Sequence, residues 1–175
     1  TMLIKKNGLV LENKKVLIHG SACTSKTALF VAKKLGAREV IRVSRKNAEG
    51  VVTYADAITV HNDCEVIVNT TPCGMFPDIG VSAIEINNFQ KLESVVDVIY
   101  NPLRSKLVCD ALEKGIKAVG GLYMLVAQAA FAAEKFVNKS VESEKIDEVY
   151  DSIFKTKQNV VLVGMPGCGK STTGR

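Results

Sequence analysis

The chain has 175 residues, of which 47% are hydrophobic and 23% charged, and its formal net charge is +5. This length suffices for one domain with a substantial core but leaves little room for two. The composition is typical of a soluble globular protein, and no segment resembles a signal peptide or a membrane span. The Lys and Arg residues are scattered, so we expect a solvated surface and no nucleic-acid or membrane partner; a local positive site for a phosphate ligand stays open.

Cysteine and histidine usage limits the metal and redox chemistry that is expected. The cysteines are odd in number and form no C-x-x-C pair, which predicts reduced thiols in a cytoplasmic protein rather than disulfides or a zinc site. The only histidines are His19 and His61, so a histidine metal cluster is not expected. The chain begins at Thr1 without a methionine, and we therefore expect a fragment of a longer polypeptide.

Strand and helix patterns alternate along the chain. The predicted strands cover residues 14–20, 39–45, 50–54, 64–72, 94–102 and 117–121, and the predicted helices cover 25–36, 106–115, 122–139 and 144–157. This alternation predicts an α/β fold, a doubly wound, mostly parallel Rossmann-like sheet with strand order 3-2-1-4-5-6. The prediction places this domain at residues 1–157 and an incomplete domain, opened by a truncated P-loop strand, at 158–175.

The loop after the first predicted strand is a candidate phosphate-binding turn, because ligands of such sheets bind at the carboxyl ends of the strands. A dinucleotide fingerprint needs three spaced glycines there, and Ala22 and Cys23 stand where further glycines are expected. Both an ordinary strand–helix turn and a phosphate-binding turn fit this loop. Its candidate cofactor-binding residues are Gly20, Ser21, Ala22, Cys23 and Thr24.

The second predicted strand ends in Ser44, Arg45 and Lys46. An NAD-binding domain places an acidic residue at this point to bind the ribose hydroxyls, whereas two cations there suit a 2′-phosphate. The pattern favours NADP over NAD. Solvated loop residues are the alternative interpretation of Arg45 and Lys46.

The end of the chain carries a second nucleotide-binding motif. Residues 164–171 (GMPGCGKS) fit the P-loop pattern G-x-x-x-x-G-K-[ST] after a β-branched run. The motif predicts ATP binding by Gly167, Gly169, Lys170, Ser171 and Thr172, with Ser171 as a Mg²⁺ ligand in a complete kinase. Only four residues follow Ser171, too few for an acidic metal partner, a substrate pocket or a lid.

Three segments together resemble shikimate dehydrogenase: residues 69–77 (NTTPCGMFP), 97–102 (DVIYNP) and 120–136 (GGLYMLVAQAAFAAEKF). The resemblance extends over residues 1–157 and implies NADP-dependent interconversion of 3-dehydroshikimate and shikimate. Residues 159–175 resemble the opening of shikimate kinase. The two enzymes catalyse successive steps of aromatic amino-acid biosynthesis, so a fused dehydrogenase–kinase polypeptide is expected.

The resemblance also implies roles for single residues. It implies that Ser44, Arg45 and Lys46 recognise the 2′-phosphate, and that the remaining matches contact the cofactor or the substrate. The cofactor contacts are Asn69, Thr70, the backbones of Val98 and Gly121, and Met124; the substrate contacts are Tyr100 and Gln128. Ordinary structural roles remain the alternative for Tyr100, Met124 and Gln128.

No catalytic residue is expected in this chain. In the family that it resembles, a lysine and an aspartate of a preceding substrate domain act on the hydroxyl proton, and residues 2–13 resemble the helix that follows that domain. We therefore expect the chain alone to be inactive and its partners to be the substrate domain and the kinase domain of the same polypeptide. Two alternatives are open: a nucleotide-binding module without chemistry, and a kinase activity at the P-loop. Shikimate and quinate are not distinguished, nor is the oligomeric state.

Overall fold

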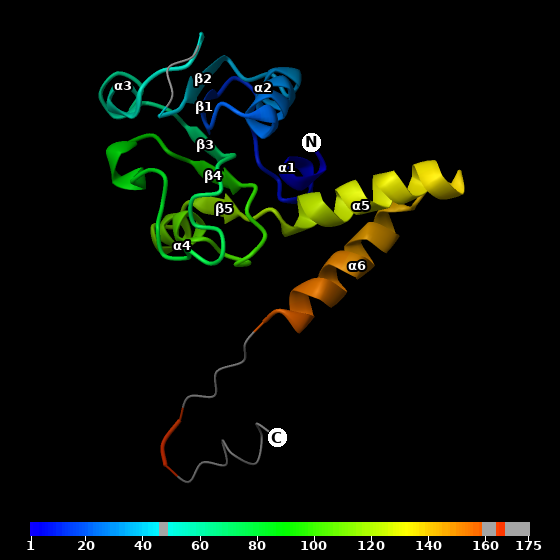
Figure 1. Ribbon diagram of the computed structural model, residues 1–175. Helices are drawn as coiled ribbons and strands as arrows, with labels where there is room; N and C mark the ends of the chain where they lie inside the picture. The colour runs from blue at the N-terminus through cyan, green and yellow to red at the C-terminus, as the bar shows by residue number, and fades with distance from the viewer. Residues whose placement is uncertain (46–48, 159–163, 167–175) are drawn as a thin grey trace.

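The computed structural model describes residues 1–45, 49–158 and 164–166. Its centre is a five-stranded parallel sheet in the order β2-β1-β3-β4-β5 (Figure 1). The strands are β1 (Lys15–His19), β2 (Glu39–Val43), β3 (Val66–Asn69), β4 (Ser94–Asp97) and β5 (Lys117–Val119). This Rossmann-like α/β sheet, with these five strands in their expected order, confirms the predicted fold class.

Seven helical segments precede, connect and follow the strands in the described part of the chain. They are α1 (Met2–Lys6), α2 (Cys23–Lys34), α3 (Tyr54–Thr59), the 3₁₀ turn η1 (Ile86–Asn88), α4 (Lys106–Glu113), α5 (Leu122–Val137) and α6 (Ser143–Thr156). The four predicted helices correspond to α2, α4, α5 and α6. Gly36 and Gly115 end α2 and α4 with φ of +79° and +72°, a left-handed conformation that glycine adopts without a side-chain clash.

The predicted strand at residues 50–54 is wrong. Only an isolated parallel bridge between Val43 and Val52 lies there, and α3 starts two residues after Val52. Thr53 caps α3, because its Oγ1 accepts a hydrogen bond from Asp56 N at 3.1 Å and donates one to the Asp56 carboxylate at 2.7 Å. The helix expected within residues 2–13 ends at Lys6, just before Gly8 with φ of +59°. The predicted P-loop strand lies outside the described residues.

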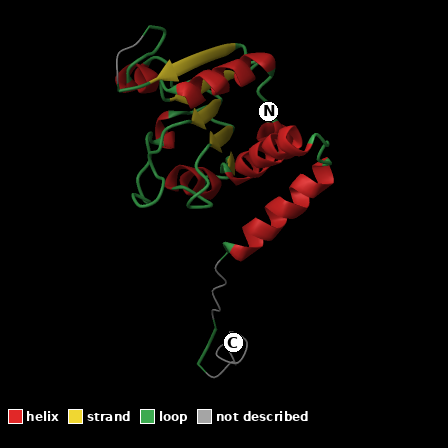
Figure 2. Ribbon diagram, turned by 45° about the vertical axis from the view of Figure 1, so that its right-hand side comes forward, coloured by secondary structure: helices red, strands yellow, loops and turns green. Residues whose placement is uncertain are grey.

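Helices cover both faces of the sheet (Figure 2). Successive side chains of a strand point to opposite faces, and both sets are mostly apolar here, so each face packs against helices. Val16 and Ile18 belong to one buried cluster, which includes residues of α1, α2, α5 and α6. Leu17 belongs to a second cluster, which includes residues of α3, η1 and α4. The sheet is thereby buried on both sides, and several residues of the loops that follow its strands, such as Ala22 and Tyr100, are exposed.

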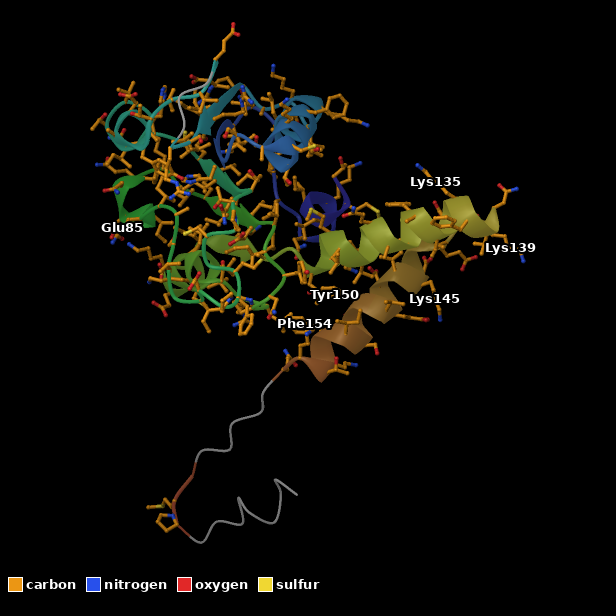
Figure 3. The ribbon with its side chains drawn as sticks, in the orientation of Figure 1. Glu85, Lys135, Lys139, Lys145, Tyr150 and Phe154 are labelled. Carbon is orange, nitrogen blue, oxygen red and sulfur yellow. The ribbon has the colours of Figure 1, made fainter. Side chains whose placement is uncertain are left out.

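Helices α5 and α6 extend away from the sheet and pack against each other (Figure 1). The Tyr123 hydroxyl donates to Asp147 Oδ1 at 2.8 Å, and the Lys6 ammonium pairs with Asp147 Oδ2 at 2.5 Å, so one carboxylate joins α1, α5 and α6. Tyr150 and Phe154 lie on the side of α6 that faces the sheet (Figure 3). Among the helices of the described ranges, none has both the length and the apolar character that crossing a bilayer requires.

Candidate functional site

The loops that follow the strands meet at one edge of the sheet, because all five strands are parallel. His19, Asn69 and Asp97 end three neighbouring strands in direct register. Hydrogen bonds connect the loops in turn: Gly20 N donates to Val43 O at 2.8 Å, and Val98 N donates to Asn69 O at 3.1 Å. The structure thus brings the described candidate segments to one edge, as the strand order predicts.

The loop between β1 and α2 lies at this edge, and its residues Ala22 and Cys23 are exposed. Gly20 has φ of +114°, and a Cβ there would lie 2.6 Å from Thr70 Oγ1, so close packing against β3 requires this glycine. Ala22 has an extended backbone with φ of −79° and ψ of −172°, and neither it nor Cys23 has positive φ. The two non-glycine residues are therefore accommodated without backbone strain.

The first turn of α2 is suited to an anion. Ala22, Cys23 and Thr24 are exposed, the turn holds no acidic residue, and no described side chain caps its N–H groups. Uncapped N–H groups and the positive end of the helix dipole attract phosphate groups. The position and chemistry of this loop therefore fit a pyrophosphate.

Arg45 follows β2 beside this loop. Two backbone hydrogen bonds fix the loop base: Ser44 N donates to Val52 O at 3.2 Å, and Val52 N donates to Arg42 O at 2.8 Å. The Ser44 and Ser21 hydroxyl groups, 3.1 Å apart, join this loop to the one before α2.

The Arg45 guanidinium acts on two groups at the carboxyl edge. Burial raises the pKa of the Tyr54 hydroxyl and of the Cys73 thiol, and the nearby positive charge of Arg45 opposes both increases. Cys73 belongs to the loop after β3, so the positive charge of Arg45 acts on a group of a second loop at the carboxyl edge. Lys46 lies outside the described residues.

Asn69 and Thr70, at the end of β3, are held by the protein itself. The Asn69 side chain is 1% exposed and contacts Thr71 and Asp97. Thr70 is half-buried, and both its backbone N–H and its hydroxyl donate to the His19 carbonyl oxygen. The Asn69 side chain therefore points into the protein interior. The neighbouring Thr70 joins the end of β3 to the end of β1.

The loop after β5 approaches β4 very closely. Gly121 N donates to Ile99 O at 2.6 Å, and a Cβ on Gly121 would lie 2.0 Å from Val98 O. Glycine is required here, and it brings the start of α5 against the end of β4. Met124 on α5 is half-buried against the core, and Gln128, one turn later on the same side, is exposed.

Tyr100 lies at the end of β4 with 42% of its surface exposed. An exposed phenol in a loop beside the start of α5 does not serve as a core side chain. Tyr100 and Gln128 both present polar groups to solvent. This placement suits contacts to a small ligand bound beyond the edge.

Sequence reasoning missed two buried residues of this edge. His19 is 0% exposed, neither ring nitrogen has a hydrogen-bond partner among the described residues, and burial lowers its pKa to about 4. Its ring packs edge-on against Tyr54, with 5.6 Å between the ring centroids. Asp97 is also 0% exposed and accepts hydrogen bonds from Asn69 and Ser105. A strand-end position at the carboxyl edge was the available signal for both.

Other parts of the chain do not add to this site. Two surface hollows, of about 370 and 360 Å³, lie against α4 and near the amino ends of β4 and β5, and no candidate residue lines either one. In the described ranges, no group of three His, Cys, Asp or Glu residues is arranged to hold a metal ion. The proposed ATP-binding residues Gly167, Gly169, Lys170, Ser171 and Thr172 lie outside the described residues.

The chain is similar to known proteins in sequence and in structure. No family model matches the chain. It is 28% identical over 162 residues to the NADP⁺ shikimate dehydrogenase of Clostridium perfringens (strain ATCC 13124), a match that covers 83% of this chain and 60% of the relative. A chorismate mutase/shikimate 5-dehydrogenase fusion protein from Clostridium acetobutylicum has a similar structure, with a TM-score of 0.81 and 30% identity over 88% of this chain and 59% of that one.

The fold is that of the shikimate dehydrogenase structures. The enzyme of Thermus thermophilus, solved in complex with NADP(H) and shikimate, matches with a TM-score of 0.72 at 22% identity over 86% of this chain and 59% of that one. Shikimate dehydrogenases are therefore homologues of this chain in sequence and relatives in structure. The chain spans about 60% of the length of the curated relative from Clostridium perfringens.

Proposed function

We propose that residues 1–157 are the NADP-binding part of a shikimate dehydrogenase, an oxidoreductase that interconverts 3-dehydroshikimate and shikimate in a longer polypeptide. The observation that carries the proposal is the position of Arg45, a cation at the end of β2 beside an uncapped helix start. A cation there suits the 2′-phosphate that distinguishes NADP from NAD. The relatives named as NADP⁺-dependent shikimate dehydrogenases support the same cofactor.

In the proposed complex, the pyrophosphate lies at the N–H groups of the first turn of α2, with the loop from Gly20 to Thr24 around it. Arg45, with Ser44 and Lys46, binds the 2′-phosphate through charge-assisted hydrogen bonds. The remaining contacts, at the nicotinamide end, are those of Thr70, Val98, Gly121 and Met124. The Asn69 side chain is committed to protein partners, so its part is to shape the loop after β3.

When bound, NADP(H) supplies or accepts the hydride of the reaction. Tyr100 and Gln128 orient the substrate beyond the nicotinamide end, and both are exposed for that contact. We propose that the proton-transferring lysine and aspartate, which the resemblance implies, belong to a preceding substrate domain of the longer polypeptide. One wall of a cleft cannot hold both reactants in place, so we propose that the chain alone has no useful turnover. Four free thiols among the described residues suit a reducing compartment such as the cytoplasm.

Titration calorimetry with NADP⁺ and NAD⁺ tests the proposed cofactor. We expect NADP⁺ to bind more tightly, and Arg45→Ala to remove the preference, because charge-assisted hydrogen bonds contribute about 1.5–3 kcal/mol, or roughly 10- to 150-fold in affinity. Arg38→Ala is a matched control, since Arg38 precedes the same strand at the opposite edge and its guanidinium bonds, within the described residues, to Glu65 at 3.3 Å and Asn13 O at 3.1 Å. Equal affinities for the two cofactors would refute the role of Arg45. Binding of neither would favour a module without chemistry.

We propose further that residues 158–175 open a shikimate kinase domain. The observation that favours it is the complete P-loop pattern at residues 164–171. In a complete kinase, Gly167, Gly169, Lys170, Ser171 and Thr172 would surround the phosphates of ATP, with Ser171 on Mg²⁺. ATP-dependent phosphorylation of shikimate by a longer polypeptide tests it: we expect activity that Lys170→Ala abolishes. No phosphorylation by the longer polypeptide would refute it.

A further inference from the structure

A row of polar side chains is buried at the carboxyl edge of the sheet. His19, Asn69 and Asp97 end β1, β3 and β4 in register, on the sheet face that packs against α3 and α4, and are 0%, 1% and 0% exposed. Burying polar groups is costly unless they are hydrogen-bonded. Asn69 and Asp97 meet this condition together, since Asn69 Nδ2 donates to Asp97 Oδ1 at 3.0 Å.

The Asp97 carboxylate organises the loop after β4. Besides the bond from Asn69, Oδ1 accepts one from Ile99 N at 3.1 Å, and Oδ2 accepts one from Ser105 Oγ at 2.5 Å. Ser105 in turn caps α4, because its Oγ accepts from Val108 N at 3.3 Å. One buried carboxylate therefore fixes both the turn that leaves β4 and the helix that follows it.

Asn69 does the same for the loop after β3. Its Oδ1 accepts hydrogen bonds from Thr71 N at 3.1 Å and from Thr71 Oγ1 at 2.7 Å. Thr71 Oγ1 accepts one from Cys73 N at 3.3 Å. The loops after β3 and β4 are thus connected through the Asn69–Asp97 pair. A backbone bond from Phe76 N to the Asn101 carbonyl oxygen, at 3.0 Å, connects them a second time.

This network lies beneath the nicotinamide end of the proposed cofactor site. The turn that Asp97 holds presents the Ile99 carbonyl oxygen to Gly121 N at 2.6 Å, and the Val98 carbonyl oxygen lies where a Cβ on Gly121 would clash. The adenosine end, by contrast, is built from the loops after β1 and β2. Within the described residues, the Asp97 carboxylate accepts hydrogen bonds from Asn69, Ile99 and Ser105, and none of these belongs to those two loops.

We propose that Asp97 is a positioning residue for the nicotinamide half of the cofactor, acting through Asn69 and Ser105 on the loops after β3 and β4. This inference rests on the proposed NADP-binding function. It has a specific consequence, because the two halves of the cofactor then depend on different parts of the edge. Disturbing Asp97 weakens the contribution of the nicotinamide half and spares the adenosine half.

Asp97→Asn tests this with little change in volume. The amide oxygen can still accept from Asn69 and Ile99 N, but an NH₂ group replaces the acceptor oxygen of the Ser105 hydroxyl, so Ser105 can no longer donate to this side chain and the negative charge is lost. Calorimetry of this chain should show NADP⁺ binding weakened about tenfold, while binding of 2′,5′-ADP, which lacks the nicotinamide half, stays within twofold. Asp110→Asn is the control: Asp110 is an acid on α4 whose carboxylate, in the described part of the chain, pairs with Lys106, and neither affinity should change.

The results separate this inference from the proposed function. Binding of NADP⁺ and 2′,5′-ADP by the unmodified chain tests the proposed function, and failure of both to bind would refute it together with this inference. If the unmodified chain binds both, equal losses for the two ligands, or no loss, in Asp97→Asn would overturn the positioning role alone. Should Asp97→Asn fail to fold, Thr71→Val decides. This variant removes the half-exposed hydroxyl between Asn69 and Cys73, and we expect the same selective loss for NADP⁺.

Discussion

His19 makes the stability of the fold sensitive to mild acid. Its imidazole is fully buried, and burial lowers its pKa from the ordinary value of 6.5 to about 4. The unfolded chain therefore binds a proton at this residue between pH 6.5 and 4 that the folded chain does not. Stability that is fully present above pH 6.5 is lost as the pH falls toward 4.

The size of the effect follows from the shift. One unit of pKa corresponds to about 1.4 kcal/mol, and a decrease from 6.5 to about 4 gives roughly 3 kcal/mol at pH 4. The typical free energy of unfolding of a domain is about 5–15 kcal/mol, so this loss is a substantial fraction of it. His19→Leu removes the titration and also removes two ring nitrogens that lack partners among the described residues. We expect this variant to be at least as stable as the wild type at pH 7.

Denaturant unfolding of both proteins at pH 7 and pH 4, followed by circular dichroism, measures the effect. The free energy of unfolding of the wild type, relative to His19→Leu, should decrease by about 3 kcal/mol between the two pH values. All other ionisable groups are present in both proteins, and their contributions largely cancel in the comparison. A constant difference between the two proteins would show that the imidazole is not buried in an apolar environment.

Two further predictions concern packing at the start of α5. Gly121→Ala places a Cβ 2.0 Å from the Val98 carbonyl oxygen, so we expect a loss of about 1–3 kcal/mol in stability and weaker NADP⁺ binding; an unchanged melting temperature would contradict the close approach. Tyr123→Phe removes the hydrogen bond of 2.8 Å to Asp147, and thermal melts should show a loss of about 1 kcal/mol; no loss would mean that this bond does not hold α6.

Much of the fold could be predicted because strand and helix periodicities alternate clearly. The helices ended by Gly36 and Gly115 carried strong local signals, and parallel pairing followed from the alternation. The predicted strand at residues 50–54 rested on the high strand propensity of the β-branched residues Val51 and Val52. In the structure, the helix signal of the residues that follow them prevails. Thr53 and Asp56 form an N-terminal capping pattern that favours α3. Between this segment and β2, the structure has a single isolated bridge, from Val43 to Val52.

The loops of the candidate site could be predicted from topology, but their internal hydrogen bonds could not. Asn69 was predicted to contact the cofactor, and the sequence did not indicate that the register of β3 with β4 also pairs its side chain with Asp97. Asp97 belongs to a segment on which the resemblance rests, yet nothing local shows that its partners are Ser105 and a backbone N–H. Such pairings depend on the residue register between neighbouring strands and on the conformation of the loops that follow them, and the predicted strand order fixes neither.

A crystal structure of this chain with NADP⁺ tests the central proposal most directly. We predict the 2′-phosphate within hydrogen-bonding distance of the Arg45 guanidinium, the pyrophosphate at the first N–H groups of α2, and the nicotinamide beside Gly121. Cofactor density against α4 or at the amino ends of the strands, or an empty carboxyl edge at a saturating concentration of NADP⁺, would contradict it.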